Sequence, residues 1–264
     1  MRFQLEEAAA CSPVLVENRR FLIKLAQNAS ETEAAMRLRY QVFRVEQGRM
    51  PGVPCNGLDR DEYDGCCRHL LAVDRSAGRV IGTYRILPGT VAAAGIGFYS
   101  EREYRFRGLR GLMPQVFEVG RACVAPEYRS GAAVALLWAG IAELRRRCGF
   151  RYMLGCVSLE HTDAAIGWRL YRQLEREGRI GGPVAAVPRP GFGLPQPEEG
   201  VPEPAESVKA LPPLFKGYLR IGAKFCGVPA LDREFGSIDF PVWFDFGSVP
   251  ERYAKHFNVQ RAGE

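Results

Sequence analysis

The chain has 264 residues, 47% of them hydrophobic, and a formal net charge of +6. A chain of this length and composition buries a full hydrophobic core, which excludes disorder throughout. Its eight cysteines form no C-x-x-C pair, and no histidine stands at zinc-ligand spacing, so we expect reduced core thiols and no metal site.

The sequence favours neither a membrane-spanning nor a nucleic-acid-binding role. The longest apolar run, residues 132–142, falls well short of the roughly 20 residues of a membrane span, and no export signal opens the chain. No recognisable nucleic-acid-binding motif accompanies the positive charge. We therefore expect a cytoplasmic protein with no nucleic-acid partner and, at most, peripheral contact with the inner membrane.

The first third of the chain predicts a strand, a helix and a hairpin. Residues 20–28 have the composition of a short strand, and Ser30 precedes a helical pattern with acidic residues in its first turn. A loop rich in glycine, proline and aspartate follows. Residues 69–74 and 80–87 then alternate around a turn, which predicts a β-hairpin.

The middle of the chain alternates strands and helices. Residues 117–124 alternate as a strand, and residues 131–147 carry apolar side chains at helical spacing. A strand at 150–158 and a helix at 162–177 follow. This order predicts an α/β fold with a mixed central sheet flanked by helices.

The last part of the chain is expected to extend that fold. Residues 181–213 hold half of the 18 prolines, and we expect a long exposed connection or lid there. A strand is predicted at 239–246, followed by a helix capped by Ser248. Residues 214–264 are too few to stand alone, so they should complete the domain formed by residues 1–180.

The segment VAPEYRSGAAV, residues 124–134, resembles the donor-binding turn of the GNAT acyltransferase superfamily. Members usually keep glycine or alanine at the positions held here by Ala132 and Val134, so that bare N–H groups face the phosphates of coenzyme A. A valine there points instead to the phosphopantetheine arm of a carrier protein, with no further cofactor. The resemblance implies these donor-binding residues: Cys123, Val124, Arg129, Gly131, Ala132 and Ala133.

Seven blocks in order sharpen the resemblance. They are LRYQVFRVEQG, DRDEYDGCCRHLLAVD, VIGTYRILPG, GFYSEREY, FEVGRACVAPEYRSG, YMLGCVSLEHTD and LPPLFKGYLRIGA with DREFGSIDF. Together they are similar to the acyl-carrier-protein-dependent ornithine N-acyltransferases, over roughly residues 20–257. That family implies a GNAT-like fold, an acyl carrier protein partner and an amino acid acceptor.

A more distant likeness to acyl-homoserine-lactone synthases implies where the site lies. Their pattern falls on Glu118 and Arg121 as catalytic residues. It also implies a set of substrate-binding residues: Arg39, Phe43, Asp61, Asp64 and Arg85. The acidic loop suits an acceptor with an additional positive charge. The two arginines either hold the acceptor's carboxylate or pair with these acids, and the sequence leaves both roles open.

An amine that attacks a thioester must lose a proton, and the resulting oxyanion needs donors worth about 3 kcal/mol each. We predict that Glu118 accepts the proton and that backbone N–H groups near Cys123 and Val124 bind the oxyanion. Arg121 lies three residues on, so regular alternation turns it to the opposite face unless a β-bulge intervenes. A supporting role behind the strand is the alternative for Arg121.

The resemblance therefore implies transfer of a long-chain or 3-hydroxy acyl group from acyl carrier protein to the α-amine of ornithine, forming lyso-ornithine lipid. One alternative is an N-acyl amino acid synthase for glutamine, glycine or tyrosine. The other is a non-catalytic, membrane-associated protein of the kind loosely called hemolysin.

Overall fold

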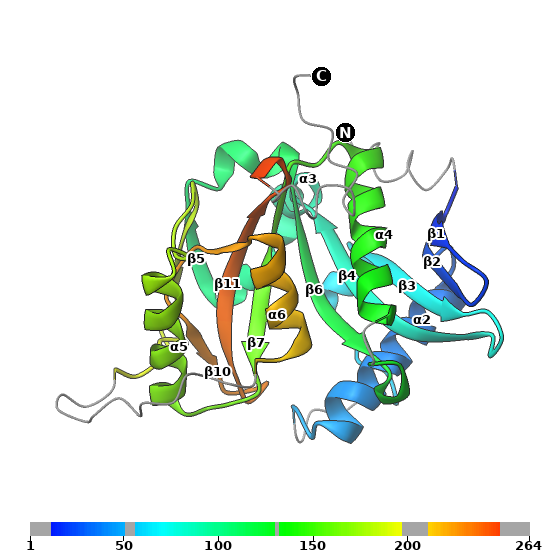
Figure 1. Ribbon diagram of the computed structural model, residues 1–264, viewed down its shortest axis with the longest axis horizontal. Coiled ribbons are helices and arrows are strands. Elements are labelled where there is room, and N and C mark those ends of the chain that lie inside the picture. The colour runs from blue at the N-terminus through cyan, green and yellow to red at the C-terminus, as the bar shows by residue number, and fades with distance from the viewer. Residues whose placement is uncertain (1–11, 51–55, 130–131, 197–210, 249–264) are drawn as a thin grey trace.

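The computed structural model describes residues 12–50, 56–129, 132–196 and 211–248. Its centre is a nine-stranded mixed sheet with the order β1-β2-β3-β4-β6-β7-β11-β10 and β9 paired to β11 (Figure 1). The strands are β1 Val14–Glu17, β2 Phe21–Leu25, β3 Arg68–Asp74, β4 Arg79–Pro88, β6 Val116–Val124, β7 Tyr152–Leu159, β9 Lys224–Phe225, β10 Ala230–Asp232 and β11 Ser237–Asp245. The predicted α/β fold with a mixed central sheet is confirmed.

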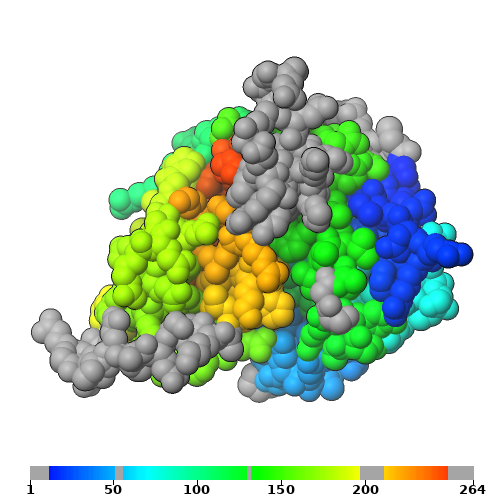
Figure 2. Space-filling model, viewed as in Figure 1, coloured from blue at the N-terminus to red at the C-terminus, as the bar shows by residue number. Residues whose placement is uncertain are grey.

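Helices cover both faces of this sheet. On one face lie α4 (Ala132–Cys148), α5 (Ala164–Arg176) and α6 (Pro213–Ile221), which Figures 1 and 2 show side by side. On the opposite face lies α2 (Ala29–Arg39), which continues as a π-helical segment, Tyr40–Glu46. Strand β4 shows the division, because Tyr84 packs on Trp138 of α4 while Arg85 shares Asp64 with Arg39 of α2.

The first helix begins slightly earlier than predicted. It starts at Ala29, and the side chain of Asn28, not Ser30, accepts the N–H of Glu31 at 3.0 Å. Asparagine is as good an N-cap as serine, and Asn28 has the extended backbone that a cap requires. The hairpin, the strands at 117–124, 150–158 and 239–246, and the helices starting near 131 and 162 agree with their predictions within two residues.

The proline-rich segment is more ordered than the sequence suggests. Its residues Ala185–Pro188 form β8, which pairs with β5 (Tyr104–Arg107) in a second, two-stranded sheet. Val184 and Leu194 are buried, so the described part is not an exposed connection. Residues 197–210, and the helix predicted after Ser248, lie outside the described residues. The described helices include none long and apolar enough to cross a membrane.

The chain after the proline-rich segment adds to the central sheet. Strand β11 pairs with β7 along eight residues, from Ile238–Leu159 to Asp245–Tyr152, and β10 forms the next hairpin outward. Helix α5 packs on this added part of the sheet, since Gly167 lies against Ile238 of β11 and against Leu194. Residues 224–245 are therefore part of the same sheet that carries β6.

The central parallel strands β6 and β7 separate halfway along their length. They pair from Val116–Tyr152 to Val119–Gly155, and beyond that point β6 runs on to Val124 and β7 to Leu159 without pairing each other. On its other side, β6 has a bulge in which Arg121 and Ala122 lie opposite Tyr84. The bulge and the separation leave a gap in the middle of the sheet.

The end of the paired region depends on Gly155. A β-carbon on this residue would lie 2.5 Å from the backbone oxygen of Val119. We expect Gly155→Ala to lower the free energy of unfolding by about 1–3 kcal/mol, as overpacking does. Gly120→Ala is the matched control, because a β-carbon there meets no atom within 4 Å. Urea unfolding followed by circular dichroism measures both, and equal stabilities would contradict this account.

Candidate active site

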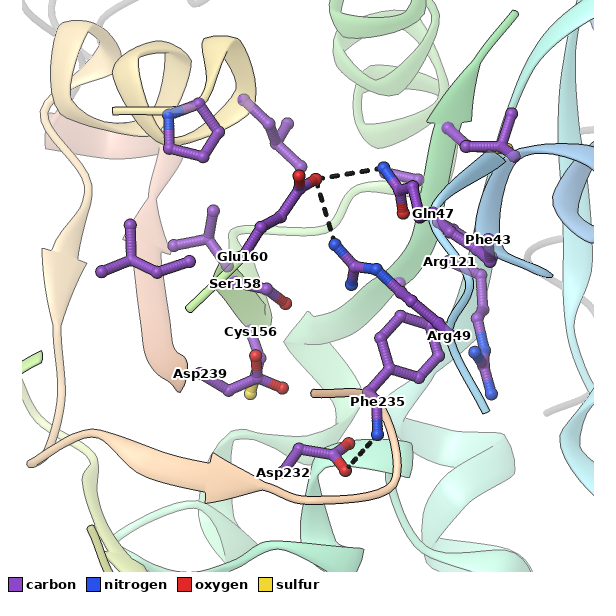
Figure 3. A pocket seen from close by; sticks show the side chains of 18 of the residues that line it. Phe43, Gln47, Arg49, Arg121, Cys156, Ser158, Glu160, Asp232, Phe235 and Asp239 are labelled. Atoms are coloured by element: carbon purple, nitrogen blue, oxygen red, sulfur yellow. Dashed lines mark hydrogen bonds and ion pairs between the residues drawn. The ribbon is translucent and has the colours of Figure 1, made fainter. Parts of the chain in front are cut away.

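A cavity of about 1240 Å³ occupies the gap between β6 and β7. Residues 120–124 of β6 form one wall and residues 156–159 of β7 form the other. The π-helical segment after α2, the β10–β11 turn and the first turn of α6 close its sides. Figure 3 shows side chains from these segments converging on the same space. The cavity therefore coincides with the break in strand pairing.

Glu118 is buried at the edge of this cavity and holds three hydrogen bonds. Its carboxylate accepts the N–H of Tyr99 at 2.6 Å, the N–H of Ser100 at 2.8 Å and the Oγ–H of Ser100 at 2.6 Å. Burial raises the pKa of Glu118 above its ordinary value, and the bonds from Ser100 and Tyr99 oppose that rise in part. A carboxylate has about four acceptor positions, so one is left for a ligand in the cavity.

Arg121 reaches the same cavity because of the bulge. It has a φ of 50°, which is unusual for a non-glycine residue, and so has Met50, with φ 52°. The two residues meet, with an Arg121 guanidinium nitrogen 4.0 Å from the sulfur of Met50. The same guanidinium also donates to Tyr99 Oη at 3.2 Å. The sequence analysis predicted that Glu118 and Arg121 share a cleft only if a β-bulge intervenes, and that bulge is present.

An aromatic side chain separates two arginines at the cavity wall. The ring of Phe235 lies between Arg49 and Arg121, whose guanidinium carbons are 4.8 and 4.9 Å from its centroid. Arg49 pairs with Glu160 at 3.0 Å, as Figure 3 shows, and the Glu160 side chain is 59% exposed. The sequence analysis did not single out Arg49 or Phe235.

The carboxylates of the acidic loop, which were predicted to suit a cationic acceptor, pair with arginines of the protein itself. Asp64 binds Arg39 through two bonds of 2.8 Å, and Asp61 binds Arg85 at 2.5 Å. A further carboxylate, Asp59, lies 3.1 Å from Nε of Arg39. Of the predicted substrate-binding residues, Phe43 lines the cavity, whereas Arg39, Asp61, Asp64 and Arg85 do not. These arginines therefore pair with the acids, the second of the two roles that the sequence left open.

Ion pairing holds this network in its charged form. Burial alone would raise the pKa of Asp64, but the hydrogen bond and charge of Arg39, with the charge of Arg85, lower it to about 2. The resulting stability is present at neutral pH and is lost as the pH falls from about 4 toward 2. The network ties α2 and the acidic loop to β4, beside the bulge of β6.

The predicted donor-binding residues fall into three groups. Cys123, Val124 and Arg129 line the cavity, whereas Ala132 and Ala133 begin α4 and do not. Gly131 lies outside the described residues. Burial raises the pKa of Cys123 to about 12, so its thiol is not a nucleophile at neutral pH.

The peptide groups of Val124 face the gap. Ala125 donates its N–H to Ile81 of β4 at 2.8 Å, and successive residues of a strand direct their N–H groups to opposite edges. Val124 thus points away from β4, and its carbonyl accepts Nε of Arg129 at 3.0 Å. Arg129 in turn holds Glu46 with both terminal nitrogens, at 2.5 and 2.7 Å.

Three carboxyl groups that the sequence analysis missed line another part of the cavity. Glu103, Asp232 and Asp239 are buried, and one ligand oxygen from each lies within 4.8 Å of the others. Burial, followed by repulsion from Asp239 and Asp232, raises the pKa of Glu103 well above its ordinary value, and burial also raises that of Asp239. We call these three residues the acidic trio. The isolated Asp239 in an apolar strand is the signal that sequence analysis had available.

Comparison with known proteins identifies the family. The L-ornithine N(alpha)-acyltransferase of Agrobacterium fabrum (strain C58) is 33% identical over 89% of this chain and 84% of its own length. That of Rhizobium meliloti (strain 1021) is 33% identical over 96% of this chain and 89% of its own length. The chain belongs to the L-ornithine N(alpha)-acyltransferase family.

Other comparisons agree that this family member is an acyltransferase with a GNAT fold. The acetyltransferase (GNAT) domain family matches residues 38–139. Among solved structures, a CoA-dependent acyl-homoserine lactone synthase, MesI, is 14% identical with a TM-score of 0.50, covering 91% of this chain and 97% of that one. FeeM, an N-acyl amino acid synthase from uncultured soil microbes, is 9% identical with a TM-score of 0.50, covering 86% and 93%. The predicted fold and acyltransferase class are confirmed.

Breaking a buried ion pair of this family member should cost more stability than breaking an exposed one. Truncating one partner leaves a buried charge uncompensated, which costs about 3–5 kcal/mol. We expect this loss for Arg39→Met, whose side chain is 1% exposed. Arg37→Met on the same helix is the control, because Arg37 is 62% exposed and its pair with Glu33 spans 3.8 Å. Chemical denaturation at pH 7 compares them, and equal stabilities would show that the network contributes little.

Proposed function

We propose that this protein transfers a long-chain acyl group, plain or 3-hydroxylated, from acyl carrier protein to the α-amine of ornithine, forming lyso-ornithine lipid in the cytoplasm. The observation that carries the proposal is the match to L-ornithine N(alpha)-acyltransferases over most of both chains. In the reaction, the amine nitrogen forms a bond to the thioester carbon, the carbon–sulfur bond breaks, and the released thiolate takes up a proton.

Glu118 is the group proposed to remove the proton from the amine. It is buried in the cavity wall, its environment raises its pKa, and one acceptor position is unused. A carboxylate with a raised pKa is a stronger base at neutral pH than an ordinary surface glutamate. The bonds from Tyr99 and Ser100 fix its orientation without blocking that position.

The Val124 N–H is the proposed donor to the thioester oxygen. It faces the gap between β6 and β7, on the strand that carries Glu118 six residues earlier. A backbone donor held in a strand needs no reorganisation when the oxyanion forms, and such a donor lowers the barrier by about 3 kcal/mol. The thioester carbon would then lie between this N–H and the amine next to Glu118.

The acceptor's carboxylate requires a cation that faces the cavity. Arg39 and Arg85 are held by Asp64 and Asp61, so they are not candidates. Arg49 lines the cavity and pairs with Glu160, which is largely exposed. The Arg49 side chain is only 10% exposed, so its charge needs a partner, and an incoming carboxylate supplies one while Glu160 returns to water. We therefore assign the carboxylate to Arg49.

The acyl chain requires an apolar part of the same cavity. Val134 of α4, Ile166 of α5 and Leu214 of α6 supply it, next to Leu137 and Tyr218.

Val134 occupies a position where a coenzyme A pyrophosphate needs bare backbone, which favours a carrier protein as donor. Exposed arginines around β5, namely Arg102, Arg105, Arg107 and Arg110, suit an acidic carrier protein.

The function is tested with purified protein, acyl carrier protein thioesters and a panel of acceptors. We expect mass spectrometry to detect acyl-ornithine, formed faster from the carrier-protein thioester than from the coenzyme A thioester. Acylation of glutamine, glycine or tyrosine but not ornithine would replace this proposal with an N-acyl amino acid synthase. Membrane lysis without any acyl transfer would replace it with a non-catalytic function.

The role of Glu118 is tested by changing its hydrogen bonds. Ser100→Ala removes a donor that stabilises the carboxylate, so the pKa of Glu118 rises further. If Glu118 is the base, the acidic limb of the pH profile of kcat/KM moves to higher pH, and Glu118→Gln lowers kcat by about 10²–10⁴-fold.

Ser76→Ala is the control for this experiment. The Ser76 hydroxyl binds Asp74 at 2.5 Å at the β3–β4 turn, outside the cavity lining, so its removal should leave the pH profile unchanged. An unshifted acidic limb in an active Ser100→Ala protein would show that Glu118 has only a structural role.

A further inference from the structure

The acidic trio has a charge balance unlike that of the other buried acids. Asp59, Asp61 and Asp64 lie within 4 Å of arginines. By contrast, none of the ion pairs among the described residues involves Glu103, Asp232 or Asp239. In addition, Oε2 of Glu103 is buried without a hydrogen-bond partner in the described part of the chain, although Glu103 lines the cavity.

Three carboxyl groups in one buried place are costly unless a cation joins them. Burying an ionised carboxylate without a partner costs several kcal/mol, and like charges add to that cost. Arg49 interacts with Asp239 and Asp232 electrostatically, but its hydrogen bond goes to Glu160. The raised pKa of Glu103 lets a proton between Glu103 and Asp239 offset part of this cost, and a bound ammonium would take the place of that proton.

The spacing of the trio suits an ammonium group. An ammonium has three N–H donors, one for each carboxylate. Charge-assisted bonds of about 2.8 Å from a tetrahedral nitrogen set the acceptor oxygens about 4.6 Å apart. One oxygen from each member of the trio lies within 4.8 Å of the others, so a single nitrogen can reach all three.

The trio is also fixed in place before a ligand binds. Asp232 accepts the N–H of Phe235 at 2.8 Å, a bond that Figure 3 draws, and Asp239 accepts the hydroxyl of Ser237 at 3.0 Å. Both residues belong to the β10–β11 hairpin, in which Asp232 pairs with Ser237. Glu103 precedes β5 and is close enough to Glu118 for their charges to interact. The trio is thus part of the cavity that holds the proposed base.

We propose that Glu103, Asp232 and Asp239 bind the side-chain ammonium of the acceptor and thereby select a diamino acid. This inference rests on the proposed function. With the side-chain ammonium held by the trio and the carboxylate by Arg49, the α-amine is the nitrogen left free to approach Glu118. The trio therefore determines both which amino acid is acylated and which of its two nitrogens reacts.

The test compares ornithine with norvaline, which has the same carbon chain and no side-chain amine. We expect the native protein to acylate ornithine with a kcat/KM about 10- to 100-fold higher than that for norvaline. This is the ratio expected from the loss of hydrogen bonds to charged groups. Glu103→Gln and Asp239→Asn should remove this preference by lowering kcat/KM for ornithine and not for norvaline. Glu175→Gln, an exposed residue of α5, is the control and should keep the native preference.

Three results would overturn the inference. The first is equal use of ornithine and norvaline by the native protein, and the second is an equal loss of activity toward both substrates in the trio variants, as for a structural role. The third is loss of activity in EDTA with recovery in Mg²⁺ or Ca²⁺, which would assign the trio to a metal. The comparison of ornithine with norvaline in the native protein tests the first of these results even if a variant does not fold.

Failure of the proposed function is recognised separately. Isothermal titration of ornithine and norvaline into the native protein needs no acyl donor and no acyl transfer. Tighter binding of ornithine, abolished in Glu103→Gln, supports the ammonium site even if no ornithine is acylated. Equal binding of the two amino acids contradicts the ammonium site, whatever the acyl donor proves to be.

Discussion

The separation of β6 and β7 after Val119 and Gly155 is the constraint on which the site depends. While the strands pair, their backbone groups satisfy each other. Beyond that point the peptide groups of Val124 face a cavity instead of a neighbouring strand. The same break gives the side chains of both strands access to one space. A fold that closed this gap would lose the binding cavity and the proposed oxyanion donor together.

The bulge in β6 is the second backbone feature on which the site depends. It inserts one residue opposite Tyr84 and turns Arg121 toward the cavity that Glu118 also lines. Arg121 adopts a φ of 50°, a conformation that costs energy for a residue with a β-carbon. Its contacts with Tyr99, Phe235 and Asp61 hold that conformation in place.

Much of the fold was predictable because its signals are local. Alternation identified the β3–β4 hairpin and β6, and helical spacing identified α4. Strand β8 was missed because prolines dominate its surroundings, although the one within it is the last residue, Pro188. The bulge was predicted only as a condition, because Glu118 and Arg121 are three residues apart and regular alternation would turn them to opposite faces.

The site was less predictable because charge pairing is decided in three dimensions. Asp61 and Asp64 have the right chemistry for a cationic acceptor, yet Arg85 and Arg39 already neutralise them. In the acidic trio, Glu103 lies more than 120 positions before Asp232 and Asp239, so no spacing in the sequence connects it to them. Both Glu103 and Asp239 nevertheless fall in blocks that carry the family resemblance, and Asp239 stands there as a charge between the apolar residues Ile238 and Phe240.

The position of the acyl group on the product tests the account most directly. Purified protein would be supplied with an acyl carrier protein thioester and ornithine labelled with ¹⁵N at the side-chain nitrogen, and the product analysed by tandem mass spectrometry. The account predicts an acyl group on the unlabelled α-nitrogen and a free labelled amine. An acyl group on the labelled nitrogen, or the absence of any acyl-ornithine, would contradict it.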